Sequence, residues 1–137
     1  MLKQISVFLP NEPGILAKFT KVLMDKNINM RALSVAETAD FGILRILVDK
    51  VDECIEILKK NNYLVTTTDV IAVDVPDKPG ALYEISKILG DNSINIEYIY
   101  STLVKDEAII VLRIDNIDKA VEVLKKKGVK LIEKQEF

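Results

Sequence analysis

The sequence contains no histidine and a single cysteine, Cys54. Histidine is the commonest general base near neutral pH and the commonest ligand of transition metals. A lone cysteine excludes a disulfide within the chain, a four-thiolate zinc site and an iron–sulfur cluster held by four cysteines. We therefore expect no cofactor and no metal. We expect no catalytic residues either, because the acidic residues show no arrangement that converges on one point.

Cys54 is the remaining candidate for nucleophilic chemistry. It lies on an apolar helical stripe that includes Val51, Ile55 and Leu58. A reactive thiol needs a neighbouring group that favours the thiolate, and the chain has no histidine to do this. We interpret Cys54 as a buried structural thiol; a nucleophile is the alternative.

The chain also lacks an excess of positive charge and any long apolar run. Its 19 basic and 21 acidic residues give a formal net charge of −2, whereas non-specific binding to nucleic acid requires surplus positive charge. Apolar stretches such as 108–112 fall far below the roughly 20 residues of a membrane span. The first residues do not resemble a secretion signal. These features predict a cytoplasmic protein that binds neither nucleic acid nor a membrane.

What the sequence does contain is an internal repeat with an offset of 66 positions. The segment 10–16 (PNEPGIL) matches 76–82 (PDKPGAL), and 56–60 (EILKK) matches 122–126 (EVLKK). All 4 prolines of the chain lie in the two matching loops. The 137 residues are 49% apolar and 29% charged, as in folded proteins. The sequence therefore predicts two related domains, at residues 1–67 and 68–137.

Apolar spacing within each copy predicts the order strand, helix, strand, strand, helix, strand. Ile5, Val7 and Leu9 alternate with their neighbours as in a half-buried strand. A helix beginning at Pro13 follows, because proline needs no N–H partner in a first helical turn. The other elements expected in the first copy are a strand from Asn29 to near Asp40, a strand at 43–49, a helix over 51–60 and a strand at 63–67. Their counterparts are a strand from Asn95 to near Asp106, a strand at 109–115, a helix over 117–126 and a strand at 130–134.

This order predicts an α+β fold, with two ferredoxin-like βαββαβ units. Each unit would be an antiparallel sheet with both helices on one face. RNA-recognition domains share this order and stack bases on aromatic side chains of the central strands. Tyr98 and Tyr100 alternate in that way, but Ala32 and Ser34 stand at the matching positions of the first copy. RNA binding is therefore the weaker interpretation.

The repeated loop is the strongest candidate for a ligand site. If Pro13 and Pro79 are the first helical residues, the caps are Glu12 and Lys78, which are unfavourable cap types. Uncapped N–H groups at a helix start attract an anion such as a carboxylate. Those expected to be free belong to Gly14, Ile15 and Leu16, and to Gly80, Ala81 and Leu82. The alternative is an ordinary turn whose N–H groups bind water.

Four polar side chains accompany these loops. Asn11 and Asp77 precede the helix starts, where they can bind the loop itself or a ligand's ammonium group. Asn29 and Asn95 open the second strand of each copy, and an amide offers donors and an acceptor to a zwitterion. Asparagine is equally usual in a turn after a helix. Because the loop of the first copy is the less acidic at Asn11, we expect it to bind a zwitterion more tightly.

The pattern (Asn/Asp)-x-Pro-Gly-x-Leu after a strand, an amphipathic helix, and Ile-Asn before the next strand resembles the ACT domain. The resemblance covers essentially the whole chain, twice. It implies a regulatory module that binds an amino acid at the interface between paired domains. By resemblance, Asn11 and Asn29 in the first copy, and Asp77 and Asn95 in the second, hold the ligand, together with backbone groups near Gly14 and Gly80.

The sequence thus predicts an amino-acid-binding regulatory protein with no enzyme activity of its own. Its expected partners are a small amino acid, a second copy in a homodimer or higher homo-oligomer, and a regulated metabolic enzyme. The alternative is a protein-docking regulatory subunit without a small-molecule ligand. The sequence names neither the amino acid nor the enzyme.

Overall fold

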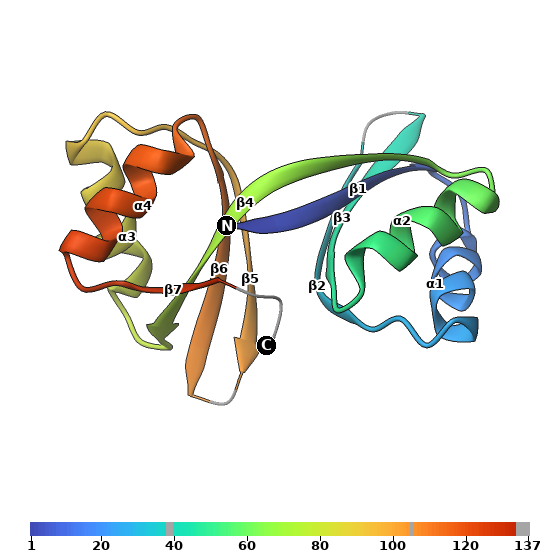
Figure 1. Ribbon diagram of the computed structural model, residues 1–137, viewed down its shortest axis with the longest axis horizontal. Coiled ribbons are helices and arrows are strands. Elements are labelled where there is room, and N and C mark those ends of the chain that lie inside the picture. Colours follow the sequence, from blue (N-terminus) through green and yellow to red (C-terminus); the bar gives the residue numbers. More distant parts are fainter. Residues whose placement is uncertain (38–39, 105, 134–137) are drawn as a thin grey trace. The chain divides into compact units, whose positions relative to one another are not determined.

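The computed structural model describes residues 1–37, 40–104 and 106–133, with the backbone alone for residues 103 and 104. Seven strands and four helices occur in these ranges (Figure 1). In chain order they are β1 (Leu2–Pro10), α1 (Ile15–Asp25), β2 (Met30–Glu37), β3 (Phe41–Val48), α2 (Val51–Lys60), β4 (Leu64–Pro76), α3 (Ala81–Asp91), β5 (Ile96–Val104), β6 (Glu107–Ile114), α4 (Ile117–Lys126) and β7 (Lys130–Ile132). Residue 134, expected to end the last strand, lies outside the described ranges.

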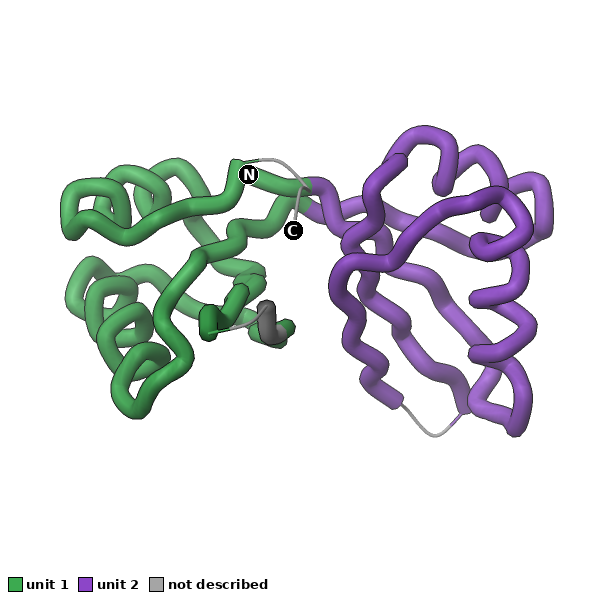
Figure 2. Tube along the Cα trace, turned by 90° about the horizontal axis from the view of Figure 1, so that it is seen from below, with its two compact units in different colours: residues 1–2, 69–135, 137 green, residues 3–68, 136 purple. Residues whose placement is uncertain are grey.

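The chain divides into two compact units, coloured separately in Figure 2. Of the described residues, the N-unit comprises residues 3–68, and the C-unit comprises residues 1–2 and those from 69 to 133. The 13-residue strand β4 contains residues of both units. It therefore ends the N-unit and begins the C-unit without an intervening loop, where the sequence predicted two separate strands.

Each unit is a four-stranded sheet with the strand order of a ferredoxin-like fold. The order is β4-β1-β3-β2 in the N-unit and β7-β4-β6-β5 in the C-unit. The pairs β1/β3 and β2/β3 are antiparallel, as are β4/β6, β4/β7 and β5/β6. Figure 1 shows both helices of a unit on the same face of its sheet. The predicted fold class is confirmed.

The core of each unit lies between its sheet and its two helices. In the N-unit, Phe19 of α1 is fully buried, and its ring meets that of Tyr63 edge to face at 5.3 Å. The helices form because their apolar residues recur every three or four positions and so line one face. Buried residues of the C-unit core are Ile71, Val73, Val75, Ala81, Ile85, Leu89, Ile94, Ile110, Leu112, Ile114, Ala120 and Leu124.

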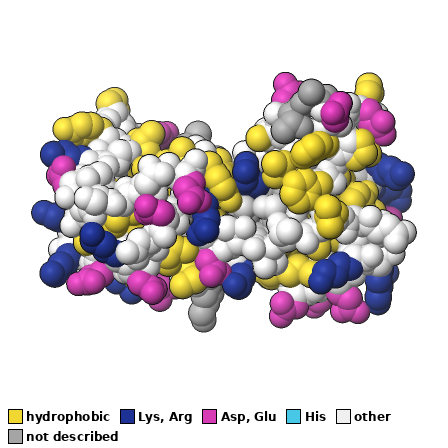
Figure 3. Space-filling view, turned by 90° about the horizontal axis from the view of Figure 1, so that it is seen from above, with side chains coloured by type: hydrophobic (Ala, Val, Ile, Leu, Met, Phe, Trp, Pro, Cys, Tyr) yellow, Lys and Arg dark blue, Asp and Glu magenta, His cyan; other side chains and the backbone are white. Residues whose placement is uncertain are grey.

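Charged side chains are distributed without a dominant sign. Figure 3 shows basic and acidic side chains interspersed on the face in view. In the helices, pairs four residues apart form ion pairs, such as Lys21 with Asp25 at 2.8 Å and Lys87 with Asp91 at 3.1 Å. These exposed pairs contribute little to stability. No helix in the described ranges is long and apolar enough to cross a membrane.

The interpretation of Cys54 as a buried thiol is confirmed. Cys54 is free and fully buried on α2, against the N-unit core. Burial, and secondarily the charge of Asp49, raises the pKa of its thiol from 9.0 to about 11. A thiol with this pKa is almost entirely protonated near neutral pH and is a poor nucleophile.

This raised pKa predicts a loss of stability at high pH. Between pH 9 and 11 the unfolded chain releases the Cys54 proton while the folded chain retains it, so the free energy of unfolding falls as pH rises. We expect this thiol to account for a loss of about 2–3 kcal/mol across that window. The measurement is urea denaturation at pH 8 to 11, followed by circular dichroism. Cys54→Ala serves as the control, and an equally steep loss in that variant would contradict the prediction.

Candidate functional site

The proline–glycine loops adopt a defined turn before each helix. In the N-unit, the Ile15 N–H donates to the Glu12 carbonyl at 3.4 Å, and Gly14 has φ 82° and ψ −6°. In the C-unit, the equivalent bond is 3.3 Å long and Gly80 has φ 93° and ψ −13°. A turn with proline second and a positive-φ glycine third is a type II β-turn.

These turns correct the predicted helix starts. Pro13 and Pro79 precede the helices, whose caps are Gly14 and Gly80, so placing the prolines in the first helical turn was wrong. Glu12 and Lys78 are therefore not cap residues. The physical reason is that a fixed proline φ suits the second position of a type II turn as well as the first position of a helix, and the following glycine favours the turn.

The turns leave some of the predicted N–H groups available. The Ile15 and Ala81 N–H groups donate within the turns and are not free. Among the described residues, no hydrogen-bond acceptor is found for the N–H groups of Leu16 and Leu82, and neither helix has a side-chain cap. A Cβ at Gly14 or Gly80 would meet no atom within 4 Å. The helix starts are thus open to approach, as an anion would require.

The polar side chains of the two loops differ in their partners, although the loop backbones do not. Asn11 Nδ2 donates to Glu37 Oε2 at 3.3 Å, which ties the N-unit loop to the end of β2. The backbone of both loops is held alike: the Asn11 N–H donates to the Asp40 carbonyl at 3.5 Å, and the Asp77 N–H donates to the Asp106 carbonyl at 3.1 Å. The part of the chain that is described contains no ion pair of the Asp77 carboxylate. The C-unit loop therefore carries an available carboxylate.

The backbones of Asn29 and Asn95 each form two hydrogen bonds with an aspartate, which the sequence did not predict. The Asn29 N–H donates to Asp49 Oδ1 at 3.1 Å, and the Asn29 carbonyl accepts from the Asp49 N–H at 3.3 Å. Asp115 holds Asn95 in the same way at the same distances. Both asparagines lie one residue before their strands and are exposed. The aspartates fix the backbone and leave the amide side chains facing solvent.

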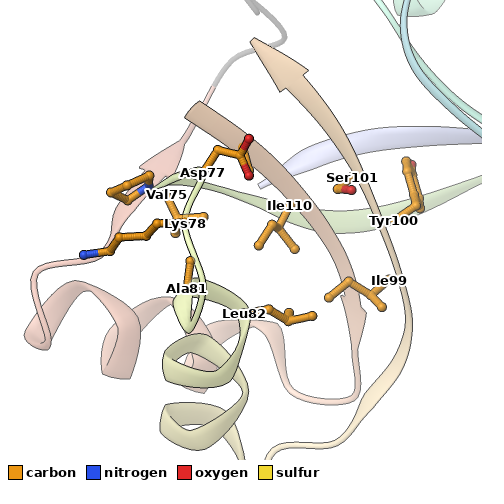
Figure 4. A pocket seen from close by; sticks show the side chains of 11 residues that line it. Val75, Asp77, Lys78, Ala81, Leu82, Ile99, Tyr100, Ser101 and Ile110 are labelled. Atoms are coloured by element: carbon orange, nitrogen blue, oxygen red, sulfur yellow. The ribbon is translucent and has the colours of Figure 1, made fainter. Parts of the chain in front are cut away.

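A hollow of about 310 Å³ opens beside the loop of the C-unit. Figure 4 shows Asp77 at one end and Leu82 and Ile99 at the other, with Ile110 between them, while the Lys78 side chain extends away. The walls come from the loop, the start of α3 and the strands β4, β5 and β6. The lining residues are Val75, Pro76, Asp77, Lys78, Ala81, Leu82, Ile99, Tyr100, Ser101, Ala108 and Ile110.

A second hollow, of about 520 Å³, lies in the N-unit at the other end of α1. Asn29 lines it together with apolar residues that include Leu23, Met24 and Leu33. An 11-residue helix is about 16 Å long, so Asn29 and the loop at Asn11 lie at opposite ends of α1. The two groups of one unit cannot reach the same small ligand.

The structure thus brings together only some of the predicted residues. Asp77, Ala81 and Leu82 line one hollow, whereas Asn29 lines another. The sequence did not identify the apolar walls at Val75, Ile99 and Ile110. The sequence shows that these residues alternate along strands. Only the sheet order shows that these strands lie beside the loop. No group of three potential metal ligands occurs in the described ranges.

Comparison with solved structures identifies related folds. A crystal structure of protein BT0572 from Bacteroides thetaiotaomicron is 44% identical, with a TM-score of 0.92, and the match covers 96% of this chain and 91% of that chain. The regulatory subunit of aspartate kinase from Thermus thermophilus is 17% identical, with a TM-score of 0.70 and coverage of 90% and 91%. The regulatory subunit of aspartate kinase from Thermus flavus is 16% identical, with a TM-score of 0.64 and coverage of 90% and 88%. At 16–17% identity the likeness concerns the fold.

No curated protein matches the chain. A family model described as an ACT domain pair matches residues 1–137, which is the whole sequence. This match agrees with the two units of the structure and with the resemblance read from the repeated loops. The chain therefore belongs to the ACT domain pair family.

Proposed function

We propose that this protein is a non-catalytic regulatory module that binds a small apolar amino acid beside the loop of the C-unit. The observation that carries the proposal is the hollow that combines the available Asp77 carboxylate, the open start of α3 and an apolar wall. A volume of about 310 Å³ is at the lower end of the range for ligand pockets, which suits a small molecule.

The charges of the hollow suit a zwitterion. The Asp77 carboxylate lies at one end, where it can accept hydrogen bonds from a ligand's ammonium group. The Leu82 N–H, without an acceptor in the described structure, can donate to the ligand's carboxylate at the positive end of the α3 dipole. Gly80 has no side chain to obstruct that approach.

The other end of the hollow favours an apolar side chain. Ile110 is 5% exposed, whereas Leu82 and Ile99 are 49% and 39% exposed. An apolar group placed between them would remove part of this surface from water, which stabilises the complex. Of the described residues that line the hollow, Asp77 and Lys78 are the charged ones, and the Lys78 side chain extends away from it. We therefore expect selectivity for amino acids such as alanine, valine or leucine.

The proposal differs from the sequence-based expectation in favouring the second loop. The sequence favoured the N-unit loop because Asn11 is neutral, yet Asn11 lies against the Glu37 carboxylate, which restores an acidic group to that loop. Asn29 and Asn95 keep a role in the proposal. Because each lies a helix length away from its own loop, it would contact a ligand held by the loop of a different ACT unit.

A bound amino acid regulates only if its affinity differs between two states of the protein. We propose that the ligand favours one arrangement of ACT units, and that a metabolic enzyme binds this arrangement differently. Two of the similar solved structures are named as regulatory subunits of aspartate kinase, which supports an enzyme as the partner.

The direct test is a thermal-shift screen against the twenty amino acids. A ligand at about 100 times its dissociation constant stabilises the fold by roughly 2.7 kcal/mol, which corresponds to a rise of several degrees in the melting temperature. We expect one or a few apolar amino acids to cause this rise. Asp77→Asn should weaken their binding by about 10- to 100-fold, because the acceptor that faces the ligand's ammonium group loses its negative charge.

Asp106→Asn is the matched control for this screen. It removes the same charge from the neighbouring exposed loop, whose contribution to Asp77 is a backbone carbonyl that the substitution keeps. The shift should persist in this variant. A shift that persists equally in Asp77→Asn would remove Asp77 from the site. Absence of a shift with every amino acid would favour the docking module without a ligand.

A further inference from the structure

Another hollow of about 310 Å³ lies in the C-unit, between the start of α3, the end of β4 and the loop that joins α4 to β7. In the sheet, β4 separates β7 from β6 and β5, so this hollow is on the opposite side of β4 from the one that contains Asp77. We call it the β7-side hollow. Lys78 belongs to the walls of both hollows, and Figure 4 shows its side chain extending away from the first one.

The β7-side hollow lies where the N-unit has a pair of aromatic rings. At the repeat offset of 66, Phe19 and Tyr63 correspond to Ile85 and Val129. The two rings of the N-unit meet edge to face at 5.3 Å. Ile85 and Val129 line the hollow and are smaller than the rings they replace. Because protein interiors are closely packed, we attribute the open space in the C-unit to this loss of side-chain volume.

Three lysines line the same hollow. Lys78 comes from the loop before α3, whereas Lys127 and Lys130 come from the segment after α4. The matching positions of the N-unit carry no lysine, because they are Glu12, Asn61 and Leu64. An ammonium group offers three donors and binds phosphate as a point charge. Positive charge therefore borders the β7-side hollow on two walls, and it does so in the C-unit alone.

Two acidic residues, Asp74 and Glu84, also line the hollow. The Asp74 side chain is 9% exposed, and its Oδ2 lies 3.0 Å from Lys130 Nζ, so these two charges largely balance each other. Within the described ranges, Lys78, Lys127 and Glu84 form no ion pair. The hollow therefore keeps two available ammonium groups, together with one carboxylate that can accept a hydrogen bond from a hydroxyl group.

We propose that the β7-side hollow binds a small phosphate ester that carries hydroxyl groups, as sugar phosphates and nucleotides do. Lys78 and Lys127 bind the phosphate group, Glu84 accepts a hydrogen bond from a hydroxyl, and the carbon skeleton lies against Ile88 and Val129. A phosphate ester carries about 1.5 to 2 negative charges near pH 7, which two ammonium groups match better than they match a single carboxylate. The volume of about 310 Å³ suits a small ligand.

The test is isothermal titration calorimetry of the full chain at low ionic strength, with ribose 5-phosphate, AMP, ribose and inorganic phosphate as probes. We expect the two esters to bind with dissociation constants below about 1 mM, inorganic phosphate to bind at least about fivefold more weakly, and ribose not to bind. Added sodium chloride should weaken the binding of the esters, because it screens exposed charges. Tighter binding of AMP than of ribose 5-phosphate would assign the site to a nucleotide, and equal binding would assign it to a sugar phosphate.

Two lysine variants test the charge. Lys127→Gln should weaken the binding of the esters about tenfold, because a charged donor is lost. Lys126→Gln is the matched control, since it removes the same charge from the preceding residue, which is not among the described residues that line the hollow. It should change the dissociation constant less than about twofold.

A third variant tests the space. Val129→Tyr introduces the residue that the N-unit has at position 63, so the ring should occupy the hollow and abolish binding. Circular dichroism verifies that the variant folds. Binding of the esters that is unchanged in Lys127→Gln, or no binding of either ester to the unmodified chain, would overturn the proposal. Because the titrations contain no amino acid, these results are independent of the test proposed for the first hollow.

Discussion

Replacing Phe19 with alanine is expected to lower the free energy of unfolding of the N-unit by about 3–5 kcal/mol. The ring is fully buried between α1 and the sheet, and it contacts Tyr63 edge to face at 5.3 Å. Its removal loses transfer free energy and leaves a cavity that a packed interior fills only in part. Urea denaturation followed by circular dichroism measures the loss.

Phe41→Ala is the matched control for this substitution. Phe41 is 39% exposed and its ring meets that of Phe8 edge to face, at 5.9 Å between ring centroids. An aromatic pair of this kind contributes about 0.5–1.5 kcal/mol. Equal losses in the two variants would mean that Phe19 is not a central core residue.

Replacing Gly14 with valine is the second substitution with a large expected effect. Gly14 has φ 82°, a conformation that is unfavourable for a β-branched residue. Because a Cβ at this position would meet no atom within 4 Å, the cost lies in the backbone rather than in a clash. We expect the free energy of unfolding to fall by about 1–3 kcal/mol, measured by the same denaturation.

A glycine in a different backbone environment provides the control. Gly90 lies within α3, and a Cβ there also meets no atom within 4 Å. Gly90→Ala should raise the free energy of unfolding by roughly 0.5–1 kcal/mol, because alanine has the better helix propensity. If both substitutions changed stability in the same direction, the left-handed conformation would not explain the effect at Gly14.

Most of the fold could be predicted because the two copies share one pattern, so the elements assigned in one copy support those assigned in the other. The apolar positions of α2 and α4 recur in both halves, and so do the four prolines, which left little ambiguity in element order. The helix starts were mispredicted because Pro-Gly fits both a helix start and a type II turn. Only the torsion angles of Gly14 and Gly80 distinguish these possibilities.

Less of the candidate site could be predicted, because the site depends on which strands and helices lie next to one another in the fold. The position of Asp49 in the sequence does not indicate its partner, yet its carboxylate accepts a hydrogen bond from the Asn29 N–H, twenty positions earlier. The apolar wall at Ile99 and Ile110 depends on the antiparallel register of β5 with β6. Residue spacing along one segment carries no information about such long-range neighbours.

The strand β4 has a consequence for any attempt to divide this protein. Its residues belong to both units, and Leu2, which is 3% exposed, belongs to the C-unit although the N-unit follows it in the chain. A polypeptide starting at residue 68 would therefore miss a buried leucine of its own unit. A polypeptide ending at residue 67 would stop inside β4, which continues without interruption to Pro76. The boundary of the sequence repeat therefore does not mark where the folded chain can be divided.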